Sequence, residues 1–423
     1  MFEPILLSKN SNNNKVNGIQ CGTPIIANCN DYESLLAMAS KATVILTCAG
    51  PFTIYGEIII KACVECSTHY VDITGETPWV NSMASTYGEN AKAKGLYMIS
   101  QAGYDSVPSD LTVALAAEMM VDDDCTYVET HHELKGGSMP TGTVNTILHL
   151  VLELRRAFLA VVTLGLVGGT TAEEKREQSR REEEQGKTSS SPGLVPKHIK
   201  GSIARDMKWN NLLPYSSLAK SWSFPHFMAA ANVPIVHTTA DSLGYGVSAG
   251  KGFTYRERLT FSSFIGGNRK GSFLTWARFL ILFLVGGGLM LPLIIPSILL
   301  FPDTTSRLIK CFNNYDFGNM KRDTFHNLFT GYQPFGFTKC MALASNGSGK
   351  VMATASFEGD YDAGLGLTAL SATTVAAAIL KRIVNGKEGK GFETAVVAIG
   401  PGALREVYEL VGIRFDCKRN GKL

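Results

Sequence analysis

The chain has 423 residues, of which 45% are hydrophobic and 18% charged. This composition excludes a disordered protein, and the length suits two or three domains. Forty Lys and Arg residues against 37 Asp and Glu residues leave a net charge of +3, too little to indicate nucleic-acid binding. Nine Cys residues, several of them in apolar runs, are typical of a reduced intracellular protein. The N-terminal residues lack a basic flank and an apolar core, so we expect no secretion.

An alternation of strand and helix patterns begins after residues 8–18, an Asn-rich polar stretch that predicts a loop or a frayed end. Strands rich in β-branched residues are predicted at 23–29, 43–48, 69–73 and 97–100. Helices are predicted at 31–40, 55–66 and 79–94, and a fourth begins at Pro108. This order predicts an α/β fold with a mostly parallel, doubly wound sheet, which we assign to a first domain of residues 1–122.

The pattern changes after Val121 to one that favours an antiparallel α+β domain over residues 123–360. Strands are predicted at 126–134 and 255–264, with a hairpin around 346–349. Residues 173–193 mix acids, bases and Ser, and predict a solvated insert without chemistry. Residues 361–423 predict helices and a strand that pack back on the body.

A long apolar segment lies at 279–301, where 23 residues contain no charge. A helix needs about 20 such residues to cross a bilayer. A run of three glycines, Pro292 and Pro296 interrupt the segment, which favours a kinked, re-entrant or monolayer-embedded hairpin. We therefore expect attachment to a lipid surface or membrane through 279–301, with a buried pair of core helices as the alternative.

The loops that follow the predicted parallel strands hold the candidate ligand-binding residues, because ligands of such sheets bind outside the carboxyl ends of the strands. Small and turn-forming residues there predict a cofactor-binding group: Gly50, Pro51, Phe52, Tyr55, Gly56, Gly75 and Glu76. The third loop offers proton-transfer and hydrogen-bonding groups in the cleft: Tyr104, Asp105 and Ser106. Asp110, in the first turn of the next helix, is expected to complement the helix dipole.

No metal site is predicted. Cys63 and Cys66 form a C-x-x-C at helical spacing without a second pair. His131 and His132 are expected on opposite faces of one strand, so they cannot easily serve one site. The H-E-x-x-H pattern is absent.

Three motif-bearing stretches resemble the saccharopine dehydrogenase-like oxidoreductases: CAGPFTIYGEIIIKACVECSTHYVDITGE at 48–76, GYDSVPSDL at 103–111 and EGDYDAGLGLTALS at 358–371. The resemblance implies a Rossmann domain that binds NAD or NADP and a second domain for substrate binding or homodimerisation. For members with an apolar segment it implies association with lipid droplets or other membranes, a mitochondrial location being an alternative. Bacterial relatives include trans-acting enoyl reductases of glycolipid biosynthesis.

The chain departs from the family at both ends of the pattern. The family begins with a strand, a glycine-rich G-A-[ST]-G-[FY]-[TV]-G turn and a second strand, and none of these precedes Thr23. No residue is therefore assigned to the pyrophosphate loop, and cofactor binding by this chain is in doubt. Near the C-terminus, G-G-V-x-T-P-A becomes Gly391-Phe392-Glu393-Thr394-Ala395, which keeps the Thr but neither the second Gly nor the Pro.

Loss of the first two strands predicts an incomplete Rossmann-type sheet. In the usual strand order these two lie in the middle of the sheet, so 43–48 would become an unpaired edge. Three explanations remain open. First, the sequence could be a fragment from an incomplete gene model. Second, it could be a degenerate paralogue that has lost cofactor binding. Third, the segments 23–29 and 43–48 could pair directly.

The family resemblance implies an NAD(P)-dependent oxidoreductase that transfers hydride to or from a lipid-type, imine or enoyl substrate. The catalytic residues stay unassigned, because in such reactions the cofactor carries most of the chemistry. The choice between NAD and NADP is not predicted, since it is normally read after the absent second strand. The alternative is a non-catalytic scaffold on a lipid droplet or membrane that has lost cofactor binding.

Overall fold

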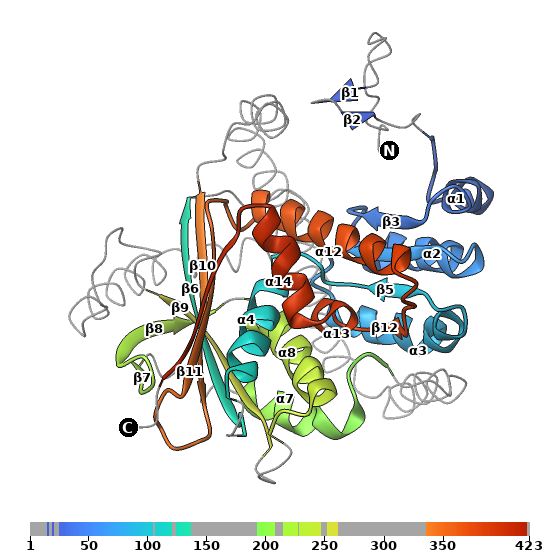
Figure 1. Cartoon of the computed structure of the whole chain (residues 1–423). Helices are drawn as coiled ribbons and strands as arrows, with labels where there is room; N and C mark the ends of the chain where they lie inside the picture. The colour runs from blue at the N-terminus through green and yellow to red at the C-terminus, as the bar shows by residue number, and fades with distance from the viewer. Residues whose placement is uncertain are drawn as a thin grey trace, which may run out of the picture.

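The structure is a computed structural model, and it describes residues 15–16, 19–20, 25–104, 106–120, 124–136, 193–207, 215–226, 228–246, 252–260 and 336–420. Two sheets, one of four and one of seven strands, dominate this part of the chain (Figure 1). Two short strands precede them, β1 (Lys15–Val16) and β2 (Ile19–Gln20), which pair antiparallel. The sequence predicts a loop or a frayed end where β1 lies.

The four-stranded sheet is parallel throughout and has the order β12-β5-β4-β3. Its strands are β3 (Val44–Thr47), β4 (His69–Asp72), β5 (Tyr97–Ile99) and β12 (Gly391–Phe392). Three helices alternate with the strands: α1 (Tyr32–Ala39), α2 (Phe52–Glu65) and α3 (Thr77–Ala93). The predicted α/β alternation is thus confirmed from residue 31 onward, and the side chain of Asp31 caps α1 by accepting a hydrogen bond from the Ser34 amide.

The strand predicted at 23–29 is wrong, because its described residues, 25–29, form no strand. The amide of Asp31 donates to the carbonyl of Asn28, so the chain turns there into the cap of α1. Ile25 and Ile26, whose side chains favour strands, are 46% and 74% exposed. β-branched side chains do not make a strand without a neighbouring strand to pair with. The described residues 25–29 therefore do not pair with β3, which lies at the edge of the described sheet.

The seven-stranded sheet has the order β13-β11-β10-β6-β9-β8-β7. Its strands are β6 (Tyr127–Gly136), β7 (Tyr215–Ser216), β8 (Ser221–Pro225), β9 (Thr254–Thr260), β10 (Gly336–Ser345), β11 (Ala353–Gly359) and β13 (Arg414–Arg419). The predicted strands and the hairpin, which is β10 with β11, are confirmed. The expected antiparallel pairing holds except between β6 and β9, which are parallel.

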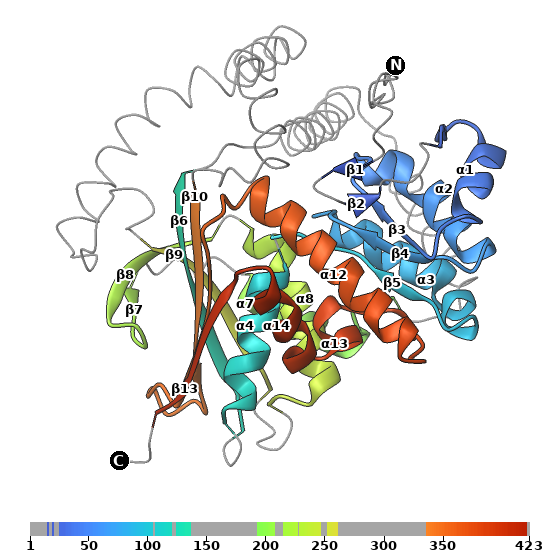
Figure 2. The same ribbon diagram turned by 45° about the horizontal axis from the view of Figure 1, so that its top comes forward.

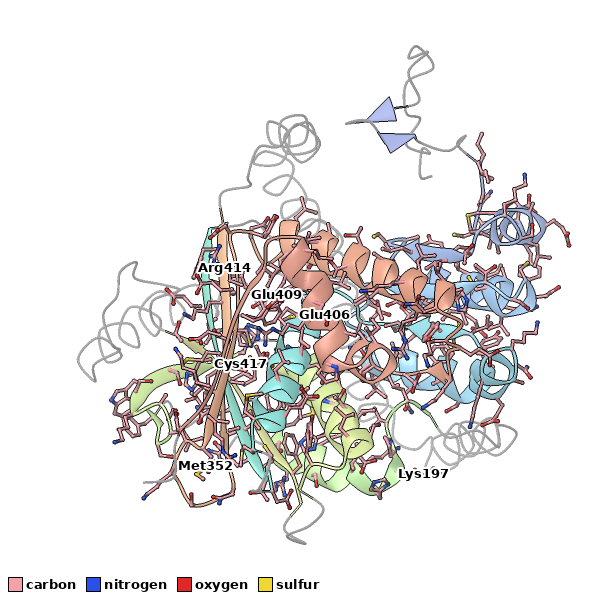
Figure 3. All side chains as sticks on the ribbon, viewed as in Figure 1. Lys197, Met352, Glu406, Glu409, Arg414 and Cys417 are labelled. Atoms are coloured by element: carbon pink, nitrogen blue, oxygen red, sulfur yellow. The ribbon has the colours of Figure 1, made fainter. Side chains whose placement is uncertain are left out.

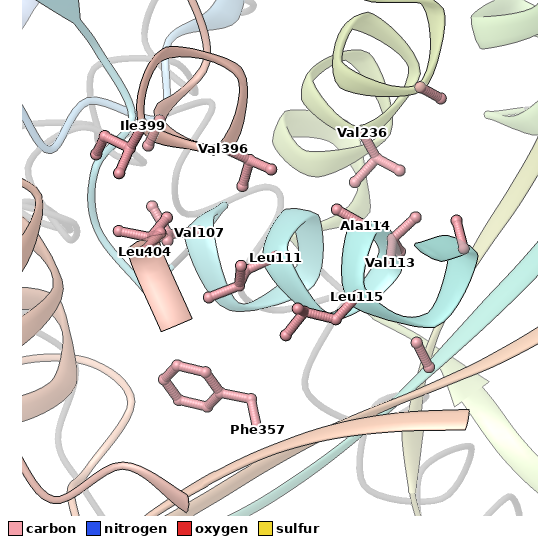
Figure 4. Close-up of a cluster of buried hydrophobic side chains, with 14 of the residues drawn as sticks. Val107, Leu111, Val113, Ala114, Leu115, Val236, Phe357, Val396, Ile399 and Leu404 are labelled. Carbon is pink, nitrogen blue, oxygen red and sulfur yellow. The ribbon is translucent and has the colours of Figure 1, made fainter. Parts of the chain in front are cut away.

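A layer of helices separates the two sheets (Figures 1 and 2). Its members are α4 (Val107–Glu118), α8 (Ala229–Leu243), α12 (Gly366–Val384), α13 (Ala395–Ile399) and α14 (Pro401–Leu410), and a short 3₁₀ helix (Lys197–Ile199) leads into α7 (Lys200–Asp206) beside α8. One apolar core joins this layer to both sheets, with Ile99 of β5 and Phe357 of β11 in the same cluster. Figure 4 shows Leu111 and Leu115 of α4 above Phe357.

A second apolar core fills the other face of the parallel sheet, where α1, α2 and α3 pack. The sheet is therefore covered by helices on both faces, as a doubly wound sheet must be. The C-terminal segment contributes to both sheets, because β12 pairs with β5 and β13 pairs with β11. Figure 3 shows Arg414 and Cys417, which both belong to β13.

The apolar segment 279–301 and nearly all of the charged insert 173–193 lie outside the described residues. Within the described part, one helix, α12, is long and apolar enough to cross a membrane by length and composition. Core helices of soluble proteins meet the same criterion, and α12 packs against α14, β3 and β4.

Candidate functional site

The carboxyl ends of β3, β4 and β5 lie at one edge of the parallel sheet. β3 ends at Thr47, β4 at Asp72 and β5 at Ile99, and the register pairs Thr47 with Asp72. The loops that hold the predicted cofactor-binding and cleft residues therefore leave the sheet side by side. Ligands of doubly wound sheets bind at this edge.

Asp72 holds two of these loops together. One carboxylate oxygen, Oδ1, accepts hydrogen bonds from the amides of Thr74 at 2.9 Å and Gln101 at 3.0 Å. The other, Oδ2, accepts from the hydroxyl of Ser100 at 2.9 Å. The side chain is fully buried, and burial raises its pKa to about 6 although these donors act in the opposite direction. Asp72 thus ties the loop after β4 to the loop after β5 at the carboxyl edge of the sheet.

Glu76 directly precedes α3, and its side chain lies at the N-terminus of α2. Its Oε2 accepts a hydrogen bond from the amide of Thr53 at 2.9 Å, and its own amide donates to the hydroxyl of Thr74 at 3.1 Å. The sequence predicts that this helix end attracts an anionic group of the cofactor. A carboxylate of the chain already stands there, so a phosphate at the same place would meet a like charge.

The predicted glycines differ in the space around them. A Cβ atom on Gly56 would lie 2.6 Å from Cη2 of Trp79, so this glycine lets α2 and α3 approach. A Cβ atom on Gly50 would make an ordinary contact with Phe52, 3.5 Å away, and one on Gly75 would meet nothing within 4 Å. Open space at the sheet edge is therefore found at Gly75.

The remaining predicted cofactor residues line the same corner. Pro51 precedes α2, and Phe52 is buried with its ring 5.9 Å from that of Trp79. Tyr55 is partly buried in the first turn of α2. These surroundings suit an NAD(P) molecule only in part, because a side chain at Gly75 would meet open space whereas Glu76 opposes a phosphate at the N-terminus of α2.

Two of the three predicted cleft residues belong to a buried polar network. The hydroxyl of Tyr104 is hydrogen-bonded to Nδ1 of His132 at 3.0 Å, and the hydroxyl of Ser106 donates to Oδ1 of Asn232 at 3.2 Å. Both side chains are almost fully buried. The third residue, Asp105, lies outside the described residues.

The network centres on Glu257 of β9. Its Oε1 lies 3.0 Å from Nε2 of His132 and accepts hydrogen bonds from Asn232 at 2.8 Å and Ser109 at 2.9 Å. Nδ1 of His226, just after β8, lies 3.6 Å from the same oxygen. All five side chains are buried.

Burial and charge together set the ionisation of this cluster. Burial by itself raises the pKa of Glu257, but His226 and His132 outweigh it and hold the pKa below its usual range. Burial lowers the pKa of His226, although the charge of Glu257 acts in the opposite direction. For His132 burial is outweighed by Cys340 and Glu257, which raise the pKa. Nε2 of His132 and Oε1 of Glu257, 3.0 Å apart, are therefore placed to share a proton.

Sequence reasoning missed this cluster because its residues come from four distant segments without a shared motif. The prediction that His131 and His132 face opposite sides of a strand is confirmed: His131 lies 3.6 Å from Glu129, and His132 faces Glu257. One usable signal was Glu257, a carboxylate inside the predicted strand 255–264. Asp72 offered a similar signal at the end of an apolar strand.

Comparison with known proteins gives relatives for part of the chain, although no protein-family model matches it. A lipid droplet localized protein of Caenorhabditis elegans is 37% identical over 128 residues, 29% of this chain and 30% of that protein. A saccharopine dehydrogenase-like oxidoreductase of Homo sapiens is 38% identical over 129 residues, 30% of each chain. A trans-acting enoyl reductase of Mycobacterium leprae is 37% identical over 99 residues, 23% of this chain and 24% of that protein.

A solved structure, the apo saccharopine dehydrogenase (L-Glu forming) of Saccharomyces cerevisiae, aligns with a TM-score of 0.40 and 10% identity over 93% of this chain and 88% of that one. The sequence matches span less than a third of the length of each of the three curated relatives. Over those stretches the resemblance predicted from the motifs is confirmed: the chain is similar to the saccharopine dehydrogenase-like oxidoreductases, a trans-acting enoyl reductase among its relatives.

Proposed function

We propose that the protein is an NAD(P)-linked oxidoreductase that binds its nucleotide at the carboxyl edge of the parallel sheet. The arrangement around Asp72 carries the proposal, because one buried carboxylate holds the Thr74 and Gln101 loops beside the open space at Gly75. The names of the relatives support the same class of reaction. A bound nicotinamide would supply the hydride chemistry, and this chain would bind and orient it.

The substrate we propose is of a lipid type with an enoyl, imine or similar acceptor group. Two observations support this class: a relative is named for its location on lipid droplets, and the sequence contains the uncharged segment 279–301. Attachment through 279–301 would bring the chain to substrates dissolved in a lipid surface.

Nucleotide binding is tested by titrating NADPH and NADH against the full chain and its Gly75→Leu variant, with fluorescence quenching as the signal. A leucine at Gly75 fills open space without a clash, so we expect folding to be unchanged and affinity to fall at least tenfold. The matched control is Gly201→Leu on α7, where a Cβ atom also meets nothing within 4 Å. Absence of binding by the unmodified chain, or equal affinities of the two variants, would contradict the proposal.

A second candidate function is a non-catalytic scaffold on a lipid droplet or membrane. It is favoured by the Glu76 carboxylate at the N-terminus of α2, where a nucleotide phosphate would be repelled. In this case the protein would float with lipid in a density gradient but bind neither nucleotide. Deleting 279–301 should then release it into the soluble fraction; retention with the lipid would show that another segment provides the attachment.

A further inference from the structure

Three buried side chains from separate parts of the chain meet at one point of the seven-stranded sheet. They are His132 of β6, His226 just after β8 and Glu257 of β9, and each offers a ligand atom within 4.8 Å of the other two. Their burial is nearly complete, with relative exposures of 1%, 3% and 5%. Two imidazoles and a carboxylate form a donor set that suits zinc-type ions.

The distances between the candidate ligand atoms resemble those between the ligand atoms of one tetrahedral metal ion. With bonds of about 2.0 to 2.2 Å to nitrogen and oxygen, ligand atoms lie roughly 3.3 Å apart, and a sulfur ligand lies roughly 3.6 Å from a nitrogen ligand. Here Oε1 of Glu257 is 3.0 Å from Nε2 of His132 and 3.6 Å from Nδ1 of His226. The sulfur of Cys340 is 3.6 Å from Nε2 of His132, the distance expected of a fourth ligand beside it.

The groups behind these side chains orient them as supporting residues orient metal ligands. The hydroxyl of Tyr104 is hydrogen-bonded to Nδ1 of His132, and the other ring nitrogen, Nε2, faces Glu257. Asn232 and Ser109 hold Oε1 of Glu257. The amide of Met228 donates to Nδ1 of His226 at 3.2 Å, and this bond would be replaced when Nδ1 coordinates an ion.

An independent observation concerns the second oxygen of Glu257. Oε2 is buried and has no hydrogen-bond partner within the described part of the chain. A buried carboxylate oxygen without a partner is costly, and an ion beside it removes that cost. Oε1 faces both histidines and accepts hydrogen bonds from Asn232 and Ser109, and Oε2 keeps its full capacity to bind the same ion.

We propose that His132, His226 and Glu257 bind one zinc-type metal ion inside the protein. Binding would displace the proton shared by His132 and Glu257, because metal ligands must be deprotonated. The full burial of the ligands fits a structural ion that fastens β6, β9 and the segment after β8, rather than one that activates water. Tyr104, in the loop after β5, links this site to the sheet edge through its bond to Nδ1 of His132.

The proposal is tested on the purified full chain by measuring its metal content by mass spectrometry. We expect close to one equivalent of zinc per chain. After removal of the metal with a chelator, titration with Co²⁺ should produce the visible absorption bands of a tetrahedral site, and Zn²⁺ should abolish them. The metal-depleted chain should melt at a lower temperature and regain its original midpoint when Zn²⁺ is added.

Two variants locate the ion. Glu257→Gln keeps the size of the side chain, and His226→Ala removes a ring; each should weaken Co²⁺ binding by about 100-fold or more. His131→Gln changes the neighbouring histidine on the opposite face and should leave binding unchanged. A folded, unmodified chain that contains no metal and gives no Co²⁺ bands would overturn the proposal, as would unaltered bands in the Glu257→Gln and His226→Ala variants.

Discussion

At the scale of single residues, burial outweighs the local roles that sequence suggests. Asp110 stands in the first turn of α4, where a carboxylate is expected to complement the helix dipole. In the structure it is 2% exposed, and burial raises its pKa to about 8. Its Oδ2 accepts a hydrogen bond from Thr239 at 2.8 Å, and Oδ1 has no partner among the described residues. Burial therefore favours the protonated form of Asp110, which interacts less with the helix dipole than a carboxylate does.

The ionisation of Asp110 predicts how stability depends on pH. Its ordinary pKa is 3.8 and its folded value is about 8, so between these values the unfolded chain has lost a proton that the folded chain keeps. This contribution to stability therefore falls as pH rises from about 4 to 8. Asp110→Asn cannot lose a proton and should be more stable than the unmodified chain at pH 8, on the order of a few kcal/mol, with a smaller difference at pH 5. Thermal melts at both pH values measure this.

Asp206 provides a control, because its pKa in the folded protein is shifted in the opposite direction from that of Asp110. Burial would raise its pKa, but hydrogen bonds from His237, Arg205 and the Tyr255 amide outweigh burial and lower it. The contribution of Asp206 to the free energy of unfolding is present above its ordinary pKa and is lost only in acid. Asp206→Asn should therefore lower the melting temperature at both pH 5 and pH 8. If Asp110→Asn lowers it in the same way at both values, Asp110 is ionised in the folded protein.

At the scale of elements, close packing explains residues that the sequence pattern assigns to a ligand. Gly56 belongs to the predicted cofactor group, yet it lies in α2 against the indole ring of Trp79 on α3. The sequence placed α2 and α3 correctly, because their apolar spacing and capping signals are local. It could not show which faces touch, since that depends on how two helices cross over the sheet.

A packing role for Gly56 predicts a loss of stability that needs no ligand. Gly56→Ala places a methyl group against Trp79 and should cost about 1 to 3 kcal/mol in the free energy of unfolding. Trp79→Phe removes part of the obstructing ring, so the double variant should recover some of the loss relative to additive effects. Chemical denaturation of the nucleotide-free protein measures both.

Gly88 on α3 is the matched control, because a Cβ atom there meets nothing within 4 Å. Gly88→Ala should be stabilising by about 0.5 to 1 kcal/mol, the usual gain when alanine replaces a helical glycine. Equal changes in the free energy of unfolding for Gly56→Ala and Gly88→Ala would show that contact with Trp79 does not restrict the size of the side chain at position 56.

At the scale of the whole molecule, the end of the chain joins the two sheets. β12 pairs with β5, and β13 pairs with β11, with Phe415 opposite Phe357. The ring of Phe357 lies 5.4 Å from those of Tyr408 and Phe415, and its side chain is fully buried in the core that also contains Ile99. We expect such a continuous core to unfold as one unit.

Phe357→Ala tests this expectation. The change should cost about 3 to 5 kcal/mol, as removal of a buried phenyl ring usually does. Amide hydrogen exchange should then speed up equally in β4 and β5 of the parallel sheet and in β10 and β11 of the other. Val384→Ala, at a site that is 85% exposed, should change neither. Faster exchange confined to the seven-stranded sheet would show that the two sheets unfold separately.

The sequence by itself determined the type and order of most elements and the polar loops after β3, β4 and β5, because side-chain periodicity, caps and turn residues are local signals. It also identified the related oxidoreductases, whose motifs are continuous. Only the tertiary structure decided that 25–29 is not a strand, that β12 pairs with β5, and that β6 runs parallel to β9. Strand partners are chosen by packing between distant segments. For the same reason His132, His226 and Glu257 became neighbours that no local pattern could predict.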